Sequence, residues 1–97
     1  MYCIVWEYEV DPAQIEEFVS AYGQDGAWVT LFRNDAAWIS TSLLRDVERP
    51  PIFVSIDRWK SAEDYARFRA QHAEMYARID AICDALTRRE TRLYAAP

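Results

Sequence analysis

Apolar and polar side chains alternate along residues 2–10, where every second position is a large apolar or aromatic residue. A period of two is typical of a β-strand that has one covered face. The same alternation returns at residues 38–46 and, less regularly, at residues 52–59. Pro50 and Pro51 cannot donate hydrogen bonds to a sheet, so we expect a hairpin connection between those two strands.

Two other segments repeat apolar residues with the 3.6-residue period of an α-helix. Pro12 favours the start of the first and Gly23 its end, because proline lacks only an amide that a first helical turn leaves unbonded. The second starts after Ser61, whose hydroxyl can cap a helix, and runs to Leu86 as one helix or as two that meet near His72. Its apolar stripe comprises Tyr65, Phe68, Met75, Tyr76, Ile79, Ile82, Cys83 and Leu86. We expect His72 to lie on that stripe and to face the sheet.

A short helix at residues 28–32 and a last strand at residues 91–95 complete the order β-α-(short α)-β-β-α-β. This order matches the ferredoxin-like α+β arrangement, in which a four-stranded antiparallel sheet carries its helices on one face. The other face is then uncovered, and we expect two copies to pack sheet against sheet as a homodimer. The apolar residues expected on that face are Val5, Ile39, Leu43, Val54 and Ile56.

Composition limits the partners of this chain. Its 97 residues are enough for one domain, which we expect to span residues 1–97. A net charge of -5 argues against nucleic acid or an anionic membrane as a partner. No apolar run approaches the roughly 18 residues of a membrane span and no leader precedes the first strand, so we expect a cytoplasmic protein. One histidine and two distant cysteines predict no metal site.

Aromatic side chains make up 14% of the chain, which is more than a small core needs. Large rings commonly line apolar pockets and subunit interfaces. The composition therefore indicates an apolar pocket or a subunit interface.

Three segments carry a resemblance to a known family: YCIVWEYEV with Asp11 and Pro12 after it, WISTSLLRD, and IDRWKSAEDYARFRAQH. In these segments the chain resembles the antibiotic biosynthesis monooxygenase group of the dimeric α+β barrel superfamily. The resemblance implies two subunits that pair sheet to sheet, and a pocket between the sheet and the helices of each subunit.

That group includes oxygenases that oxidise aromatic polyketides or quinols without metal or flavin, and relatives that cleave haem held by a helical histidine. The resemblance thus implies a cofactor-independent monooxygenase of a small aromatic, polyketide or quinol-like compound, with Trp59 and His72 at matching positions. The haem-cleaving relatives need an asparagine in the first strand, where this chain has Trp6, so haem binding or degradation is the weaker reading. The alternative from another class is a non-catalytic module that binds an aromatic metabolite or a partner.

The catalytic candidates are His72, Asp57 and Trp59. His72 is either the base that takes a phenolic proton, since imidazole titrates near neutral pH, or a structural histidine at a helix break. Asp57 lies on the same strand face as Trp59 and is the candidate to orient that imidazole. A buried carboxylate needs a partner, which we expect to be His72, a tyrosine hydroxyl or water, with a salt bridge to an arginine as the alternative. Trp59 either stacks on a planar substrate or fills the core.

The substrate-binding candidates are aromatic side chains, each of which has a core role as its alternative. They are Trp6, Tyr22, Phe32, Trp38, Tyr65 and Tyr76. A cavity that reaches Trp59 and His72 would favour ligand chemistry, whereas a filled layer would favour the inert module.

Overall fold

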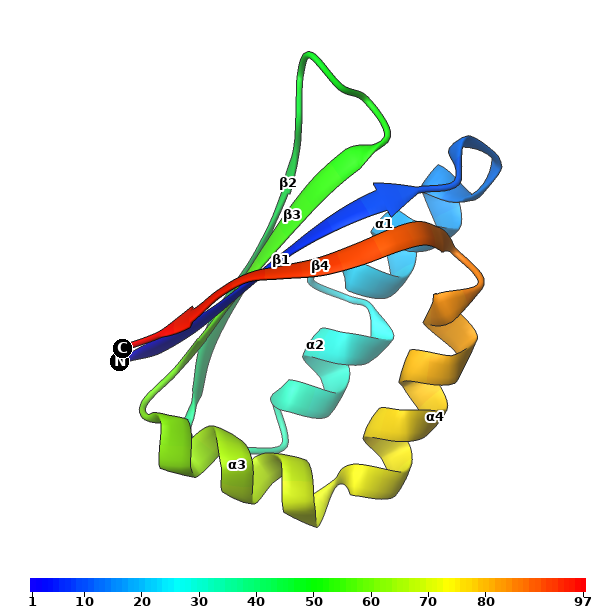
Figure 1. Ribbon diagram of the computed structural model, residues 1–97. Coiled ribbons are helices and arrows are strands. Elements are labelled where there is room, and N and C mark those ends of the chain that lie inside the picture. The colour runs from blue at the N-terminus through cyan, green and yellow to red at the C-terminus, as the bar shows by residue number, and fades with distance from the viewer.

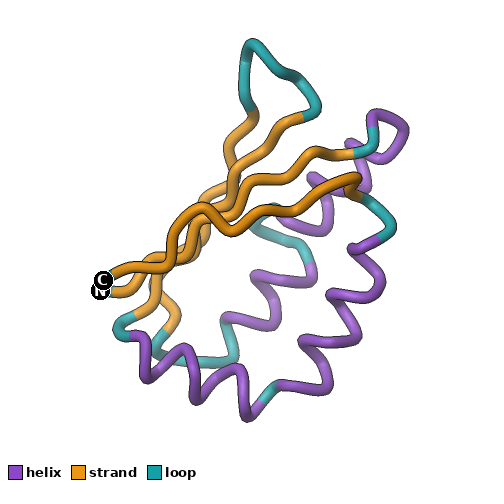
Figure 2. The backbone as a smooth tube through the Cα atoms, in the orientation of Figure 1, coloured by secondary structure: helices purple, strands orange, loops and turns teal.

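A computed structural model, which covers residues 1–97, shows a twisted antiparallel sheet with its helices on one side (Figures 1 and 2). The strands are β1 (Tyr2–Val10), β2 (Trp38–Arg45), β3 (Ile52–Trp59) and β4 (Thr87–Ala96), and they lie side by side in the order β2-β3-β1-β4. This is the strand order of the ferredoxin-like fold, so the predicted fold class is confirmed. β4 begins four residues earlier than the sequence pattern predicts.

The helices are the 3-10 turn η1 (Pro12–Gln14) and α1 (Ile15–Tyr22), α2 (Ala27–Phe32), α3 (Ala62–Gln71) and α4 (Ala73–Asp84). Ser61 caps α3 as predicted, since its Oγ accepts a 3.0 Å hydrogen bond from the Asp64 amide. Between α1 and α2 a side chain at Gly26 would collide with the carbonyl oxygens of Ser20 and Ala21, so only glycine fits this turn. None of the helices combines the length and the apolar character that crossing a membrane would require.

The predicted long helix is two helices, which is one of the two arrangements that the sequence allows. The backbone of His72, with φ -117° and ψ 24°, leaves helical geometry and ends α3. α4 then leaves at an angle, and Figure 1 shows the two helices forming a corner. α4 has a different orientation from α3, so the residues of α4 that face inward do not continue the stripe of α3. The placement of Met75 and Ile82 on the inner stripe is therefore wrong, since they are 43% and 68% exposed.

α2 occupies the space between the sheet and the corner of α3 and α4 (Figure 1). Four of its six residues are buried. The Trp28 ring lies 4.8 Å from Tyr76 of α4, and the Phe32 ring lies 5.4 Å from Trp59 of β3 and 5.7 Å from Phe68 of α3. The short helix is therefore a part of the core, packed against both helices of the corner and against β3.

A register shift at Ile39 changes which residues of β2 face the helices. After the shift Thr41 pairs with Asp57 and Leu43 with Ser55, so Thr41 and Leu43 both lie on the helix side. The expectation that Leu43 faces the open side is therefore wrong, whereas Ile39 is 46% exposed. An extra residue in a strand reverses every later side chain, and the sequence alternation does not reveal it.

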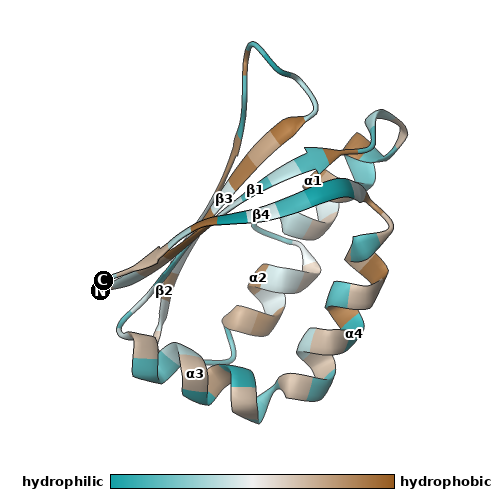
Figure 3. Cartoon of the chain, viewed as in Figure 1, coloured by the Kyte–Doolittle hydropathy of each residue, from teal (hydrophilic) through white to brown (hydrophobic).

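The open face of the sheet carries apolar residues at its centre. Val5 pairs with Ile56 and with Tyr94, and Leu44 pairs with Val54, so these five side chains share that face. Figure 3 shows that the first half of β4, by contrast, is hydrophilic. The apolar part of the open face is thus confined to the middle of the sheet and one end of β4.

Candidate active site

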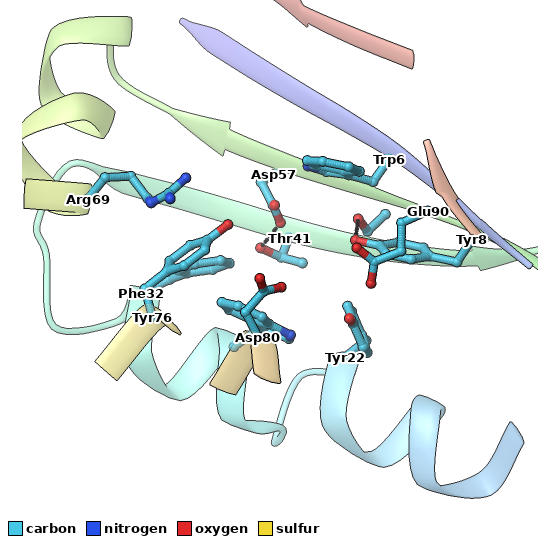
Figure 4. A pocket seen from close by; sticks show the side chains of 12 residues that line it. Trp6, Tyr8, Tyr22, Phe32, Thr41, Asp57, Arg69, Tyr76, Asp80 and Glu90 are labelled. Carbon is cyan, nitrogen blue, oxygen red and sulfur yellow. Dashed lines mark hydrogen bonds between the residues drawn. The ribbon is translucent and has the colours of Figure 1, made fainter. Parts of the chain in front are cut away.

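A cavity of about 220 Å³ lies between the sheet and the helices (Figure 4). All four strands and all four α-helices contribute to its wall. The aromatic part of the wall consists of Trp6, Tyr8, Tyr22, Trp28, Phe32 and Tyr76. The polar part consists of Thr41, Ser55, Asp57, Arg69, Asp80 and Glu90. Pockets for drug-sized ligands have volumes of about 300–1,000 Å³, so this smaller space suits a molecule of one or two aromatic rings.

Four of the six predicted substrate-binding residues line this cavity, namely Trp6, Tyr22, Phe32 and Tyr76. The other two lie behind its wall. Trp38 donates a 3.1 Å hydrogen bond from Nε1 to Thr41 Oγ1, and the Tyr65 hydroxyl accepts one of 3.3 Å from Arg69. Trp38 and Tyr65 therefore hold residues of the wall in place.

Trp59 is a core residue in this fold. Its side chain is 0% exposed, and its ring lies 4.7 Å from Phe68, 5.3 Å from Tyr65 and 5.4 Å from Phe32. Its indole Nε1 is buried without a hydrogen-bond partner. The cavity does not reach it, so of the two alternatives for Trp59 the geometry favours the core role.

His72 lies outside the cavity, contrary to the expectation that its ring faces the sheet. It stands at the corner between α3 and α4, with its ring 4.9 Å from Phe68 and beside a surface depression that it shares with Gln71 and Glu74. The spacing of four residues from Phe68 to His72 suggested a continuous inward stripe. The end of α3 at His72 interrupts that stripe and leaves the half-buried side chain off the cavity wall.

Asp57 is the central polar group of the cavity (Figure 4). Its Oδ1 accepts a 2.8 Å hydrogen bond from the Thr41 hydroxyl, which itself accepts the hydrogen bond from Trp38. Neither His72 nor an arginine pairs with it, so the expected imidazole contact and the alternative salt bridge are both absent. The expected hydrogen-bond partner is present, but it is the hydroxyl group of a threonine and not that of a tyrosine. The bond from Thr41 engages Oδ1 alone, which leaves Oδ2 for a molecule in the cavity.

Burial raises the pKa of the Asp57 carboxyl to about 6. The Thr41 hydrogen bond and the positive charge of Arg58 act in the opposite direction, but they offset only part of the effect. Arg58 lies on the open face, where it donates to Ser40 and Ser42. A carboxyl group that titrates near neutral pH is suited to proton transfer.

The tyrosine hydroxyl groups of the wall remain protonated. Burial raises the pKa of Tyr8, Tyr22 and Tyr76 well above the ordinary value of 10.0. The Tyr8 hydroxyl lies 3.2 Å from Ser55 Oγ, within hydrogen-bond distance. These phenols act as neutral hydrogen-bonding groups and not as bases.

The charges in the cavity wall are unbalanced. Arg69 is its only cation, against the carboxyl groups of Asp57, Asp80 and Glu90. Burial raises the pKa of Glu90, and the nearby negative charges of Asp80 and Asp84 raise it further. In no part of the chain do three or more His, Cys, Asp or Glu side chains gather as a metal site would require.

Sequence reasoning identified part of this wall and missed the rest. Thr41 and Ser55 are polar residues at inward strand positions. The alternation in the sequence places Ser55 on the same face as Asp57, but the register shift at Ile39 hides the inward position of Thr41. Arg69, Asp80 and Glu90 carry no such signal, because charged residues on helices and edge strands usually face water. They come together only through the corner of α3 and α4 and the return of β4.

Comparison with known proteins places this geometry in context. The sequence profile of one family, described as antibiotic biosynthesis monooxygenase, matches residues 1–77. No curated protein is similar in sequence to this chain.

Solved structures share its fold. SnoaB, a cofactor-independent oxygenase from Streptomyces nogalater, is 19% identical with a TM-score of 0.76, over 96% of this chain and 90% of that chain. A protein described as an antibiotic biosynthesis monooxygenase is 18% identical with a TM-score of 0.67, over 100% of both chains. A conserved protein from Methanosarcina mazei Go1 is 13% identical with a TM-score of 0.70, over 94% of this chain and 88% of that chain.

Proposed function

This chain belongs to the antibiotic biosynthesis monooxygenase family, and from that premise we propose that it is a cofactor-independent monooxygenase of a small phenol or quinol. The likeness of its fold to SnoaB, a cofactor-independent oxygenase, supports the proposal. The observation that carries it is Asp57, a carboxyl group with a pKa of about 6 in the wall of an aromatic-lined cavity. The size of the cavity, about 220 Å³, favours substrates of one or two rings.

In the proposed reaction Asp57 takes the proton of a substrate hydroxyl group. The O–H bond of the substrate breaks, an O–H bond forms on Asp57 Oδ2, and the negative charge moves to the aromatic ring. An electron-rich anion reacts with molecular oxygen more readily than the neutral phenol does. O₂ adds to a ring carbon as a peroxide, whose O–O bond then breaks together with the C–H bond of that carbon. The oxygen on the ring becomes a new carbonyl, and the other oxygen leaves as water with the proton of that carbon and the proton held by Asp57, so the substrate itself supplies the electrons.

The energy of the first step is compatible with turnover. A phenol has a pKa of about 10, so transfer of its proton to a carboxylate of pKa about 6 costs about 5 kcal/mol. A turnover rate of about 10 per second corresponds to a total barrier of about 16 kcal/mol, which leaves about 11 kcal/mol for the reaction with oxygen. Acidic phenols are favoured because their hydroxyl groups lose a proton more easily, and quinols because their anions give electrons to oxygen more readily.

The proposal gives His72 no part in the chemistry, because its ring lies outside the cavity. For the same reason the helical histidine is not placed to hold a haem there. The lack of an imidazole in the cavity favours the second candidate function, a module that binds an aromatic metabolite without oxidising it. The two functions share a ligand class and differ in oxygen consumption.

Oxygen uptake separates the two functions. A panel of one-ring and two-ring quinols, with anthrone as a larger member, is incubated with the protein under oxygen. We expect uptake with at least one quinol, a loss of about 100-fold in Asp57→Asn, and normal uptake in the matched variant Asp25→Asn, whose carboxyl group is exposed. His72→Ala is expected to retain full activity. Binding of the panel without uptake would favour the non-catalytic module.

We also propose that two copies pair through the open face of the sheet. The centre of that face is apolar, with Val5, Val54 and Ile56 side by side on neighbouring strands. Leu44 and Tyr94 beside them are 51% and 67% exposed in the single chain. Burial of this surface against a second copy removes apolar area from water without covering the cavity, which opens on the other side of the sheet.

A further inference from the structure

Arg69 is held at the cavity by aromatic residues and not by a carboxylate. Its guanidinium carbon lies 3.7 Å from the centre of the Tyr76 ring, and its Nη1 donates a 3.3 Å hydrogen bond to the Tyr65 hydroxyl. Other arginines of the chain, such as Arg67 and Arg78, form ion pairs with acidic residues of their own helix. Arg69 forms no ion pair, and the negative charge of Asp80 in the same wall acts on it only from a greater distance.

The guanidinium group keeps donors for a further partner. An arginine has five N–H donors in one plane, and the bond to Tyr65 uses one of them. Tyr76 covers a face of the plane and leaves its edges free to donate. Figure 4 shows Arg69 reaching along the wall toward the side of the cavity where Asp57 lies. The two groups thus face the same space from α3 and β3.

We infer that Arg69 binds the oxygen atom of the substrate hydroxyl group as it becomes ionised, while Asp57 receives the proton. This inference rests on the proposed function and adds a second catalytic residue to it. When the proton moves to Asp57, the negative charge moves from the carboxylate to the substrate oxygen. A fixed guanidinium beside that oxygen favours the ionised form, because it meets the charge with hydrogen bonds that need no rearrangement.

The substrate class follows from this arrangement. The oxygen must carry a negative charge between the edge of the guanidinium and Asp57, so the hydroxyl group stands directly on the aromatic ring, where that charge is delocalised. Ring and hydroxyl then lie in one plane between Tyr76 and the sheet. A benzylic alcohol would bring its hydroxyl to the same place, but its O–H is too weakly acidic to give up a proton there.

A chromophoric phenol tests the inference without any oxidation. The phenolate of para-nitrophenol absorbs visible light and the neutral form does not, so absorbance reports the pKa of the bound probe. The titration is run with the protein in saturating excess for wild type, Arg69→Gln, Arg69→Lys and the control Arg78→Gln, whose side chain is exposed and pairs with Glu74. Circular dichroism verifies that each variant is folded.

We expect the pKa of the bound probe to be about one unit higher in Arg69→Gln than in wild type, a tenfold loss of the ionised form. Arg78→Gln should match wild type, and Arg69→Lys should fall between wild type and Arg69→Gln, since lysine keeps the charge but not the planar donors. An equal pKa in wild type and Arg69→Gln would overturn the inference, as would an unchanged pKa in Arg69→Lys if the glutamine variant does not fold.

The outcome is separable from that of the oxygen-uptake experiment. The pKa of the probe could differ between Arg69→Gln and wild type while the protein consumes no oxygen. That result would support the role of Arg69 in binding a phenolate and reject the oxygenase function. Oxygen uptake with an unshifted probe pKa would retain the oxygenase and remove Arg69 from it. If Arg69 only joined α3 to Tyr76 of α4, Arg69→Gln would lower the midpoint of unfolding and leave the pKa of the bound probe unaltered.

Discussion

The Thr41 hydroxyl donates a 2.8 Å hydrogen bond to the Asp57 carboxylate across the pairing of β2 with β3. The two residues stand directly opposite each other on the helix side of the sheet. Trp38 fixes the orientation of the Thr41 hydroxyl, because its Nε1 donates to the same oxygen. The result is a carboxylate with one oxygen held by the protein and the other facing the cavity.

The raised pKa of Asp57 makes the stability of the fold depend on pH. Burial takes this pKa from the ordinary 3.8 to about 6, so between these pH values the folded protein holds a proton that the unfolded chain has released. The contribution of Asp57 to the free energy of unfolding therefore falls as the pH rises from 4 to 6 and is constant above. The fall amounts to about 2 to 3 kcal/mol.

Asp57→Asn removes this dependence, because an amide does not titrate, while its oxygen can still accept from Thr41. We expect the free energy of unfolding of wild type to drop by about 2 to 3 kcal/mol relative to Asp57→Asn between pH 4 and pH 7. Urea unfolding at several pH values measures it, with Asp25→Asn expected to follow wild type. Parallel curves for wild type and Asp57→Asn would mean that Asp57 titrates normally.

A core role for Trp59 predicts a loss of stability without a loss of binding. Trp59→Phe removes part of a side chain that is 0% exposed, so we expect a decrease of about 1 to 3 kcal/mol in the free energy of unfolding. The affinity for a phenol should remain within about twofold of wild type, since the cavity does not reach Trp59. Tyr76→Leu, in the wall, provides the contrast and should weaken binding about tenfold. Weak binding by Trp59→Phe at full stability would restore Trp59 to the site.

The proposed dimer predicts an effect of charge on the open face. Ile56 pairs with Val5 and Ser42 at the centre of that face, and Ile56→Glu would bury a carboxylate between two copies. We expect wild type to have twice the mass of one chain in light scattering, and Ile56→Glu to have the mass of one chain. Val47→Glu is the control, because Val47 is 94% exposed in the hairpin loop. Wild type with the mass of one chain would end the dimer proposal.

The acidic side of the cavity predicts selection among substituted phenols. Asp80 and Glu90 line the cavity and neither forms an ion pair, so an ammonium group on the substrate is attracted and a carboxylate is repelled. At pH 8 we expect tyramine to bind about tenfold more tightly than hydroxyphenylpropionate, with para-ethylphenol between them. Quenching of tryptophan fluorescence reports binding, because Trp6 and Trp28 are in the wall.

A double variant, Asp80→Asn with Glu90→Gln, should reduce that difference to about threefold or less, with little change for the neutral phenol. Equal affinities of the three ligands for wild type would show that the two carboxyl groups do not act on the bound molecule.

The sequence predicted the elements, their order and part of the cavity wall. Alternation marks β1, β2 and β3, and the cap at Ser61 marks the start of α3, because each signal arises within a few residues of chain. The order of these elements was enough to predict the ferredoxin-like fold. Trp6 and Tyr76 were found as aromatic candidates at inward positions, and Asp57 as a polar residue in such a position.

The tertiary structure alone decided which of these residues share one space. The helix break at His72 keeps the ring of that residue off the cavity wall, and a register shift at Ile39 brings Thr41 to Asp57. Arg69 reaches the same cavity because the corner between α3 and α4 brings it against Tyr76. The periodicity of the sequence predicts on which face of its own helix or strand each side chain lies. Which elements meet depends on contacts between residues distant in sequence, and the cavity with its charges is a product of those contacts.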